Sequence, residues 1–300
     1  MDGSTAARTR DFLFEASHMD GAAKPHIAHD WRAGAHVVSE ASPRLLLFPC
    51  FLSQAETEHL LSLARMRQDS GLCSSRDTNG RTISVSLPQP CDDPVISAIE
   101  ERCAAATGIP VHPDEEPLGM RHTNPATATE CSERMCTALH VDTNQGGYFR
   151  CATVLVYLHD IEIGGETRFP LLGAAEDSDL RAAAERLAGL GVTAFNGDED
   201  VEWPPIAPRR ILMDAAENSA IGLHVKPKRG LACVFWTHTA NGLDPCSWHV
   251  GARLPPEQVE GKLLAQKFKA LPIAHQLAAK RSRGGKVMLP AELLPPQMPA

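Results

Sequence analysis

His140 and Asp142 are spaced so that both side chains could bind one metal ion. Residues i and i+2 of a β-strand project to the same face, and imidazole nitrogens and carboxylate oxygens are both ligands of divalent transition metals. A run of strand-forming residues follows at 152–158, and the turn sequence Gly164-Gly165 comes after it. One histidine and one aspartate do not complete a site, and a His-x-Asp pair also occurs on solvated strands. The metal interpretation therefore depends on a second histidine downstream.

Three histidines further along the chain could complete this site: His224, His238 and His249. Hydrophobic periodicity does not choose among them, and for each the alternative is a strand or loop histidine with a local partner. His159 follows a predicted strand and is expected to be exposed.

A second, weaker ligand pair is Cys131 and Cys136, which could bind zinc only together with other ligands. We favour reduced, structural thiols at both positions.

Composition restricts the class of protein. The 300 residues are 43% hydrophobic, which is enough for one large domain or two small ones. A net charge of −8 without a strongly basic region argues against a nucleic-acid binder that neutralises phosphates. No apolar run approaches the roughly 18 residues that a membrane span needs.

Targeting signals are also missing from the two ends of the sequence. The N-terminal residues lack the apolar segment of a signal peptide, and the C-terminal residues are not a retention signal. Nine cysteines without a secretory signal are expected to be mostly reduced. We therefore predict a cytoplasmic protein.

The chain divides by character into three parts. Residues 1–40 are expected to be a loosely held arm, residues 41–269 the main domain and residues 270–300 a tail. Two polar stretches within the domain, at about 123–137 and 171–221, are interpreted as insertions that could form a lid or recognise a partner.

Periodicity predicts the order of helices and strands. Helices are expected from Ser53, from Asp93-Pro94 to Gly108, and at 177–190 within the second insertion, whose remainder is expected to be loop. Strands are expected at 44–48, 81–87, 118–122, 152–158, 223–226, 231–236, 248–250 and 261–268. Short strands separated by turns and supported by helices favour an antiparallel barrel or jelly roll.

Several motifs occur in an order that is similar to one known family. They are Pro43-Arg44, Phe51-Leu52-Ser53, Arg81-Thr82-x-Ser84, His140-x-Asp142, Arg150-x-x-Thr153-Val154-Leu155-x-Tyr157-Leu158, Gly164-Gly165-Glu166-Thr167-x-Phe169-Pro170, Lys226-Pro227-x-x-Gly230, Phe235-Trp236, Gly242-x-Asp244-Pro245-x-x-x-His249 and Gly261-Lys262. Together they resemble the catalytic domain of the prolyl 4-hydroxylases, which are Fe(II)- and 2-oxoglutarate-dependent dioxygenases, over roughly residues 43–268. The resemblance implies a mainly β fold with supporting helices and a double-stranded β-helix core (jelly roll, cupin-like).

The resemblance also implies a set of site residues. It selects His249 as the second imidazole, which with His140 and Asp142 gives the facial triad of non-haem Fe(II) oxygenases. In the family, 2-oxoglutarate takes two of the open metal positions and O₂ takes the last. Lys262 is then implied to bind the distal carboxylate of 2-oxoglutarate, and Thr167 to donate a hydrogen bond to it.

The chain departs from the family at His122, where a tyrosine that contacts 2-oxoglutarate usually stands. His122 could donate the same hydrogen bond, or Tyr148 or Tyr157 could replace it. Ascorbate is implied as a further cofactor.

The implied reaction hydroxylates an unactivated C–H bond and releases succinate and CO₂. The expected substrate is proline within a peptide or protein, and Arg81, Arg150 and Arg168 could contact it, with structural pairing as the alternative. Two other functions stay open: a hydroxylase of a free amino acid or other small molecule, and a binding module without turnover. The oligomeric state is also left open.

Overall fold

The structure is a computed structural model that describes residues 29–40, 42–70, 75–76, 82–87, 92–133, 136, 139–143, 149–175, 178–194, 206–239 and 242–273. Arg81, Tyr148, most of the predicted arm and most of the tail lie outside these ranges. None of the helices within them has the length and apolar character that a membrane crossing requires.

The described helices are α1 (Gln54–Asp69), α2 (Pro94–Thr107), α3 (Ala128–Glu133), α4 (Asp179–Gly189) and α5 (Ile206–Glu217). The described strands are β1 (His36–Ser39), β2 (Leu45–Phe48), β3 (Ser75–Arg76), β4 (Thr82–Ser86), β5 (Gly119–Thr123), β6 (Arg150–Tyr157), β7 (Thr167–Phe169), β8 (Leu223–Val225), β9 (Ala232–Trp236), β10 (His238–Thr239), β11 (Gly242–Leu243), β12 (Val250–Gly251) and β13 (Lys262–Ala270).

Two antiparallel sheets form the centre of the molecule. The larger has the strand order β1-β2-β9-β6-β13-β5-β4-β3, and the smaller has the order β12-β7-β8. Along the chain, β5, β6, β9 and β13 in the larger sheet alternate with the β7–β8 pair and β12 in the smaller one. The segment at His140, between β5 and β6, bridges to His249 beside β12 and so extends the smaller sheet. This alternation is the winding of a double-stranded β-helix, and the predicted fold class is confirmed.

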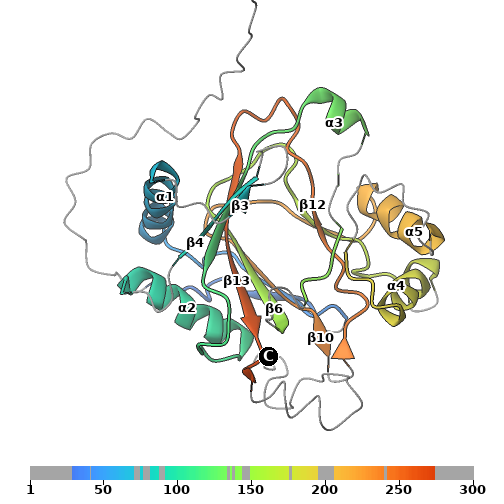
Figure 1. The fold of residues 1–300 in the computed structure, drawn as a ribbon, viewed down its shortest axis with the longest axis horizontal. Coiled ribbons are helices and arrows are strands. Elements are labelled where there is room, and N and C mark those ends of the chain that lie inside the picture. Colours follow the sequence, from blue (N-terminus) through green and yellow to red (C-terminus); the bar gives the residue numbers. More distant parts are fainter. Residues whose placement is uncertain are drawn as a thin grey trace, which may run out of the picture.

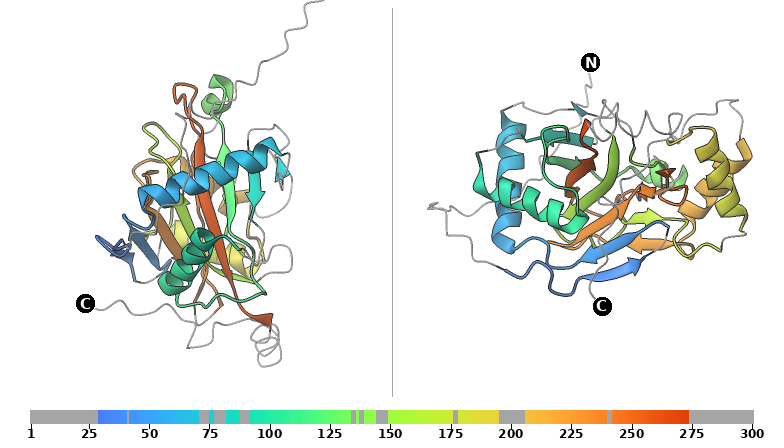
Figure 2. Two further views of the ribbon diagram at one scale, coloured as in Figure 1. Left: turned by 90° about the vertical axis from the view of Figure 1, so that its left-hand side faces the viewer. Right: turned by 90° about the horizontal axis from the view of Figure 1, so that it is seen from below.

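Helices cover the two outer faces of this core. In Figure 1, α1 and α2 lie on one side of the strands and α4 and α5 on the other, and the second view in Figure 2 agrees. Apolar residues of α1 and α2 pack against the outer face of the larger sheet, where Leu60 and Ile99 meet Val154 and Leu263. The space between the sheets has its own apolar cluster, which includes Leu264.

The helix starts follow from local sequence. Ser53 accepts a hydrogen bond from the Glu56 backbone N–H, and the Glu56 carboxylate accepts one from the Ser53 backbone N–H, which is the predicted capping box. Asp93 caps α2 in front of Pro94. Gly108 ends that helix at φ 75°, a conformation that glycine adopts without a Cβ clash.

Replacing Ser53 with alanine is expected to lower the free energy of unfolding by about 1 kcal/mol, because the first turn of α1 loses its side-chain acceptor. Urea denaturation measures the change. Ser62→Ala, an exposed position within the same helix, is the matched control and is expected to leave stability unchanged or slightly raised. Equal stabilities for the two variants would contradict the capping role.

Three local expectations were wrong. The second insertion contains α5 as well as the predicted helix, although its remainder was expected to be loop. Residues 36–39, which were assigned to the loosely held arm, form strand β1 and pair with β2. His159 was expected to be exposed but is 8% exposed, because its Nε2 lies 2.6 Å from the Gly261 carbonyl oxygen beneath the start of β13.

Candidate metal and cosubstrate site

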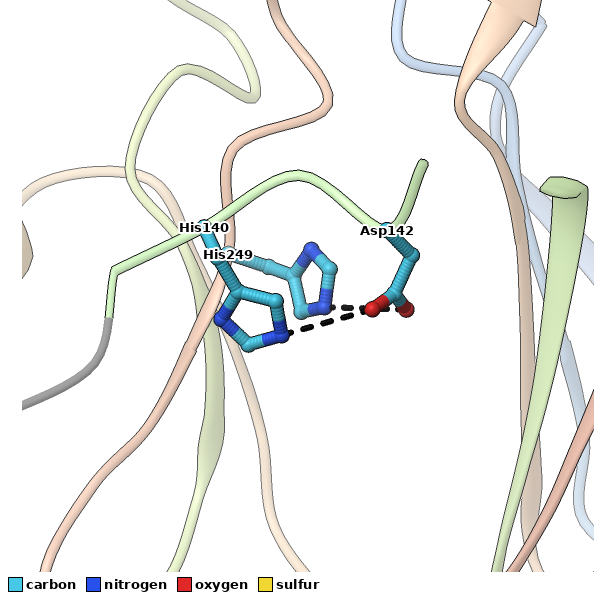
Figure 3. A group of neighbouring side chains, drawn as sticks. All are labelled: His140, Asp142 and His249. Atoms are coloured by element: carbon cyan, nitrogen blue, oxygen red, sulfur yellow. Dashed lines mark ion pairs between the residues drawn. The ribbon is translucent and has the colours of Figure 1, made fainter. Parts of the chain in front are cut away.

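Two imidazoles and one carboxylate meet between the sheets. His140, Asp142 and His249 each offer one ligand atom, and these atoms lie within 4.8 Å of one another. Each Asp142 oxygen faces one imidazole: His140 Nε2 is 3.4 Å from Oδ1, and His249 Nε2 is 3.3 Å from Oδ2 (Figure 3). Among the described residues, this is the one group of three or more such side chains. The set fits Fe(II), which two histidines and one carboxylate hold on one face.

The backbone brings the two distant histidines together. The His140 N–H donates to the His249 carbonyl at 3.0 Å, and the His249 N–H donates to the His140 carbonyl at 2.9 Å. His249 Nδ1 lies 3.1 Å from the Ser247 carbonyl oxygen, so this nitrogen carries the proton and Nε2 keeps its lone pair for a metal.

Asp142 is held as an anion by its surroundings. It is 3% exposed and accepts a hydrogen bond from the Thr153 hydroxyl at 2.8 Å. Burial alone would raise the pKa of this carboxyl, but the neighbouring imidazoles of His249 and His140 outweigh it and hold the pKa well below its usual range. The site therefore presents a metal with an ionised carboxylate at neutral pH.

Thr153→Val is expected to weaken Fe(II) binding about tenfold, because outer hydrogen-bond partners of metal ligands typically contribute this much to affinity. Valine keeps the shape of the side chain and removes the donor. Anaerobic titration with Fe(II) gives the dissociation constant. Thr237→Val is the control, at a buried threonine whose hydroxyl lies within hydrogen-bond distance of the Arg150 carbonyl and His238 Nδ1. An unchanged constant in Thr153→Val would show that the hydrogen bond has no part in metal binding.

The other two candidate histidines lie apart from this group. His224 Nε2 is 3.1 Å from the Ile221 carbonyl oxygen. His238 packs on Phe149 with ring centroids 4.6 Å apart, and burial lowers its pKa to about 4. Both histidines therefore have local partners, which was the alternative to metal binding.

Lys262 lies inside the barrel close to the metal-ligating residues. It is 6% exposed, and its Nζ donates to the Gly165 carbonyl at 2.8 Å. A Cβ at Gly251 would lie 3.5 Å from the same Nζ. Gly251 lies two residues beyond His249, so the two residues share a face of this extended segment. Lys262 therefore faces the inside of the barrel, two residues along this segment from the candidate metal position.

Thr167 and Tyr157 lie in the same part of the barrel. The Tyr157 hydroxyl donates to Thr167 Oγ1 at 2.7 Å, and Thr167 is paired in register with Gly251, which borders Lys262. Burial, opposed in part by Glu166 and reinforced by Arg121, lowers the pKa of Lys262 to about 8. A buried cation with two hydroxyls nearby could hold one end of a dicarboxylate.

His122 does not join this group. Its strand neighbour Met120 packs in the core under α1 and α2, and His122 lines a small cavity with Ala64 and Gln68 of α1. His122 therefore lies on the opposite face of the larger sheet from Lys262. The expected contact between His122 and 2-oxoglutarate does not fit this geometry. Its Nδ1 is buried without a hydrogen-bond partner.

The described arginines that were candidates for substrate contact are engaged in pairs. Arg150 makes two hydrogen bonds to the Glu116 carboxylate, at 2.6 and 2.7 Å. Arg168 donates to the Ala216 carbonyl at 3.1 Å and so fastens the end of α5 to β7. Both arginines therefore have structural partners, which was the alternative to substrate contact.

Helices α4 and α5 of the second insertion pack on the outer face of the smaller sheet. Leu187 of α4 and Leu212 of α5 share an apolar cluster with Val141 and Val250, which alternate with the ligand residues. Cys136 is buried in the same cluster, and its thiol donates to the Ala216 carbonyl. In the described part of the chain, Cys136 belongs to no metal-ligating group.

Comparison with curated proteins finds similarity to plant prolyl 4-hydroxylases. No family model matches the sequence. The chain is 31% identical over 216 residues to probable prolyl 4-hydroxylase 3 of Arabidopsis thaliana, covering 70% of this chain and 64% of that protein. It is 28% identical over 219 residues to prolyl 4-hydroxylase 2 of the same plant, covering 70% and 62%. The chain thus spans less than two thirds of the length of these curated relatives.

Among solved structures, the viral collagen prolyl hydroxylase of Paramecium bursaria Chlorella virus-1 is similar with a TM-score of 0.45 at 17% identity, covering 76% of this chain and 96% of that one. A Pseudomonas putida prolyl-4-hydroxylase is similar with a TM-score of 0.40 at 12% identity, covering 76% and 93%.

Proposed function

This chain is a relative of the plant prolyl 4-hydroxylases, and from that relationship we propose that it is an Fe(II)- and 2-oxoglutarate-dependent dioxygenase. Its substrate is a proline residue within a peptide or protein. The relatives' names give this substrate class, and the chain covers 64% and 62% of the lengths of those two relatives.

The observation that carries the proposal is the joint placement of a facial triad and a buried cation. His140, Asp142 and His249 offer three ligand atoms that lie within 4.8 Å of one another. The Lys262 ammonium lies inside the same barrel next to Gly251, which is two residues beyond the ligand His249. A metal that must also bind a keto acid with a second carboxylate needs both features.

Each residue then has a defined task. His140, Asp142 and His249 hold Fe(II), with Thr153 fixing the carboxylate. Lys262 receives the distal carboxylate of 2-oxoglutarate. When bound, iron and 2-oxoglutarate supply the O₂-dependent oxidation that hydroxylates the substrate and yields succinate and CO₂, with ascorbate expected to keep the iron reduced.

Apolar side chains shield the site from water. Phe235 lies against the His249 ring with centroids 4.6 Å apart, and Phe169 stacks on the same ring at 5.6 Å. Both phenylalanines are fully buried. A dry wall beside one ligand limits the access of water to the reacting centre.

The test is mass spectrometry of proline-rich peptides incubated with the protein, Fe(II), 2-oxoglutarate and ascorbate. We expect a gain of one oxygen atom on proline and one succinate per hydroxylated residue, and neither product with Asp142→Ala. Succinate formed with a free amino acid but with no peptide would support the small-molecule hydroxylase instead. No succinate with any substrate would favour a binding module without turnover.

A further inference from the structure

Strand β5 presents Arg121 to the inside of the barrel. Side chains alternate between the two faces of a strand, and Met120 and His122 both face the helices. Arg121 therefore projects from the other face, toward the smaller sheet. Its register partner on β13 is Leu264, which packs in the cluster between the sheets and so confirms which face this is.

Arg121 is a close neighbour of Lys262 on this face. Lys262 stands two residues before Leu264 on β13, so it lies diagonally across from Arg121. Diagonal neighbours in an antiparallel pair have Cβ atoms about 7–8 Å apart, within reach of long side chains. The positive charge of Arg121 also contributes to the lowered pKa of Lys262, as expected for two cations at short range.

The two cations differ in exposure. The Lys262 side chain is buried, with 6% of its surface exposed, whereas the Arg121 side chain on the same face of the sheet is exposed to solvent. Thr123 is directly opposite Lys262 and shares the face. Like charges this close repel each other, and an anion between them would relieve the repulsion.

We infer that Arg121 is a specificity-determining residue that binds the distal carboxylate of the 2-oxo acid together with Lys262. This inference rests on the proposed function, because it assigns a further residue to the cosubstrate of that site. A planar guanidinium donates two parallel hydrogen bonds to a carboxylate, while Lys262 supplies a point charge from the buried side. The pair selects a dicarboxylic 2-oxo acid over a monocarboxylic one.

The test compares two ligands of equal chain length, 2-oxoglutarate and 2-oxopentanoate, of which only the first has a distal carboxylate. Calorimetry with the Mn(II)-loaded protein measures both dissociation constants without turnover. Arg121→Leu is expected to weaken 2-oxoglutarate binding about tenfold, the usual effect of losing a charge-assisted hydrogen bond. It should leave 2-oxopentanoate binding unchanged, and Arg121→Lys should restore part of the loss.

His122→Leu is the matched control, because it is adjacent in sequence but faces the helices. It is expected to leave both dissociation constants unchanged. An Arg121→Leu protein that binds 2-oxoglutarate like the wild type, or that loses both ligands equally, would overturn the role of Arg121. A wild-type protein that binds no 2-oxoglutarate would overturn the proposed function itself, and this inference with it.

Discussion

Replacing His249 with alanine is expected to weaken Fe(II) binding by at least about 100-fold and to abolish succinate formation. The loss follows because His249 offers one of three ligand atoms within 4.8 Å of one another, and even outer partners of metal ligands contribute 10–100-fold, in round terms, to affinity. Anaerobic Fe(II) titration measures the dissociation constant directly.

The control variants separate metal binding from folding. His249 packs against Phe235 and Phe169, so alanine leaves a cavity, and His249→Gln fills that space without an imidazole. Both variants should lose iron, whereas His224→Ala, at a histidine outside the group, should keep it. Iron binding by His249→Ala at wild-type strength would remove this residue from the site.

Replacing Lys262 with methionine is expected to weaken 2-oxoglutarate binding roughly 100-fold, since it removes the buried cation that pairs with the distal carboxylate. The wild-type affinity should also depend on pH. Burial lowers the pKa of Lys262 to about 8, so the side chain is cationic below that pH and becomes neutral above it. The dissociation constant for 2-oxoglutarate should therefore be flat below pH 8 and rise about tenfold per pH unit above it.

Titration calorimetry between pH 6 and 10 tests this dependence, with the Mn(II)-loaded protein as the sample. The guanidinium of Arg121 keeps its charge over this range, so Arg121 contributes no step. Lys262→Met should bind weakly at every pH. A rise above pH 8 that persists in Lys262→Met would assign the titration to another group.

Local sequence predicted the elements whose signals are local. The capping box at Ser53 and the Asp93-Pro94 start were sufficient to place α1 and α2. Runs of β-branched and aromatic residues located β6 and β9 because both strands are buried on both faces and read as continuous apolar segments.

Helix α5 escaped prediction because prolines precede it and Pro208 is its third residue. Proline is tolerated in the first helical turn, where the backbone N–H has no partner within the helix. The stability of this helix comes from tertiary packing of Leu212 and Ala216 near the smaller sheet, together with the Arg168 hydrogen bond. None of these contacts is visible in the local sequence.

The choice between His122 and Arg121 depends on a single residue step. A motif match gives a position along a strand, but the face depends on how the strand packs, and a shift of one residue reverses it. Packing of Met120 under the helices fixes the face and turns Arg121 inward. Thr153 was also missed as a partner of Asp142, although a threonine within the apolar run of residues 151–156 was an available signal.

Selection of His249 over His224 and His238 needed either the family resemblance or the fold. Periodicity along one strand carries no information on which distant strand pairs beside it. The reciprocal hydrogen bonds between the His140 and His249 backbones provide that information.

Crystals of the protein grown without oxygen in the presence of Fe(II), with diffraction measured at the iron absorption edge, test the central claim most directly. We expect one anomalous peak within ligand distance, about 2.0–2.2 Å for such donors, of His140 Nε2, an Asp142 oxygen and His249 Nε2. An iron peak elsewhere, or one that His249 does not contact, would contradict the site.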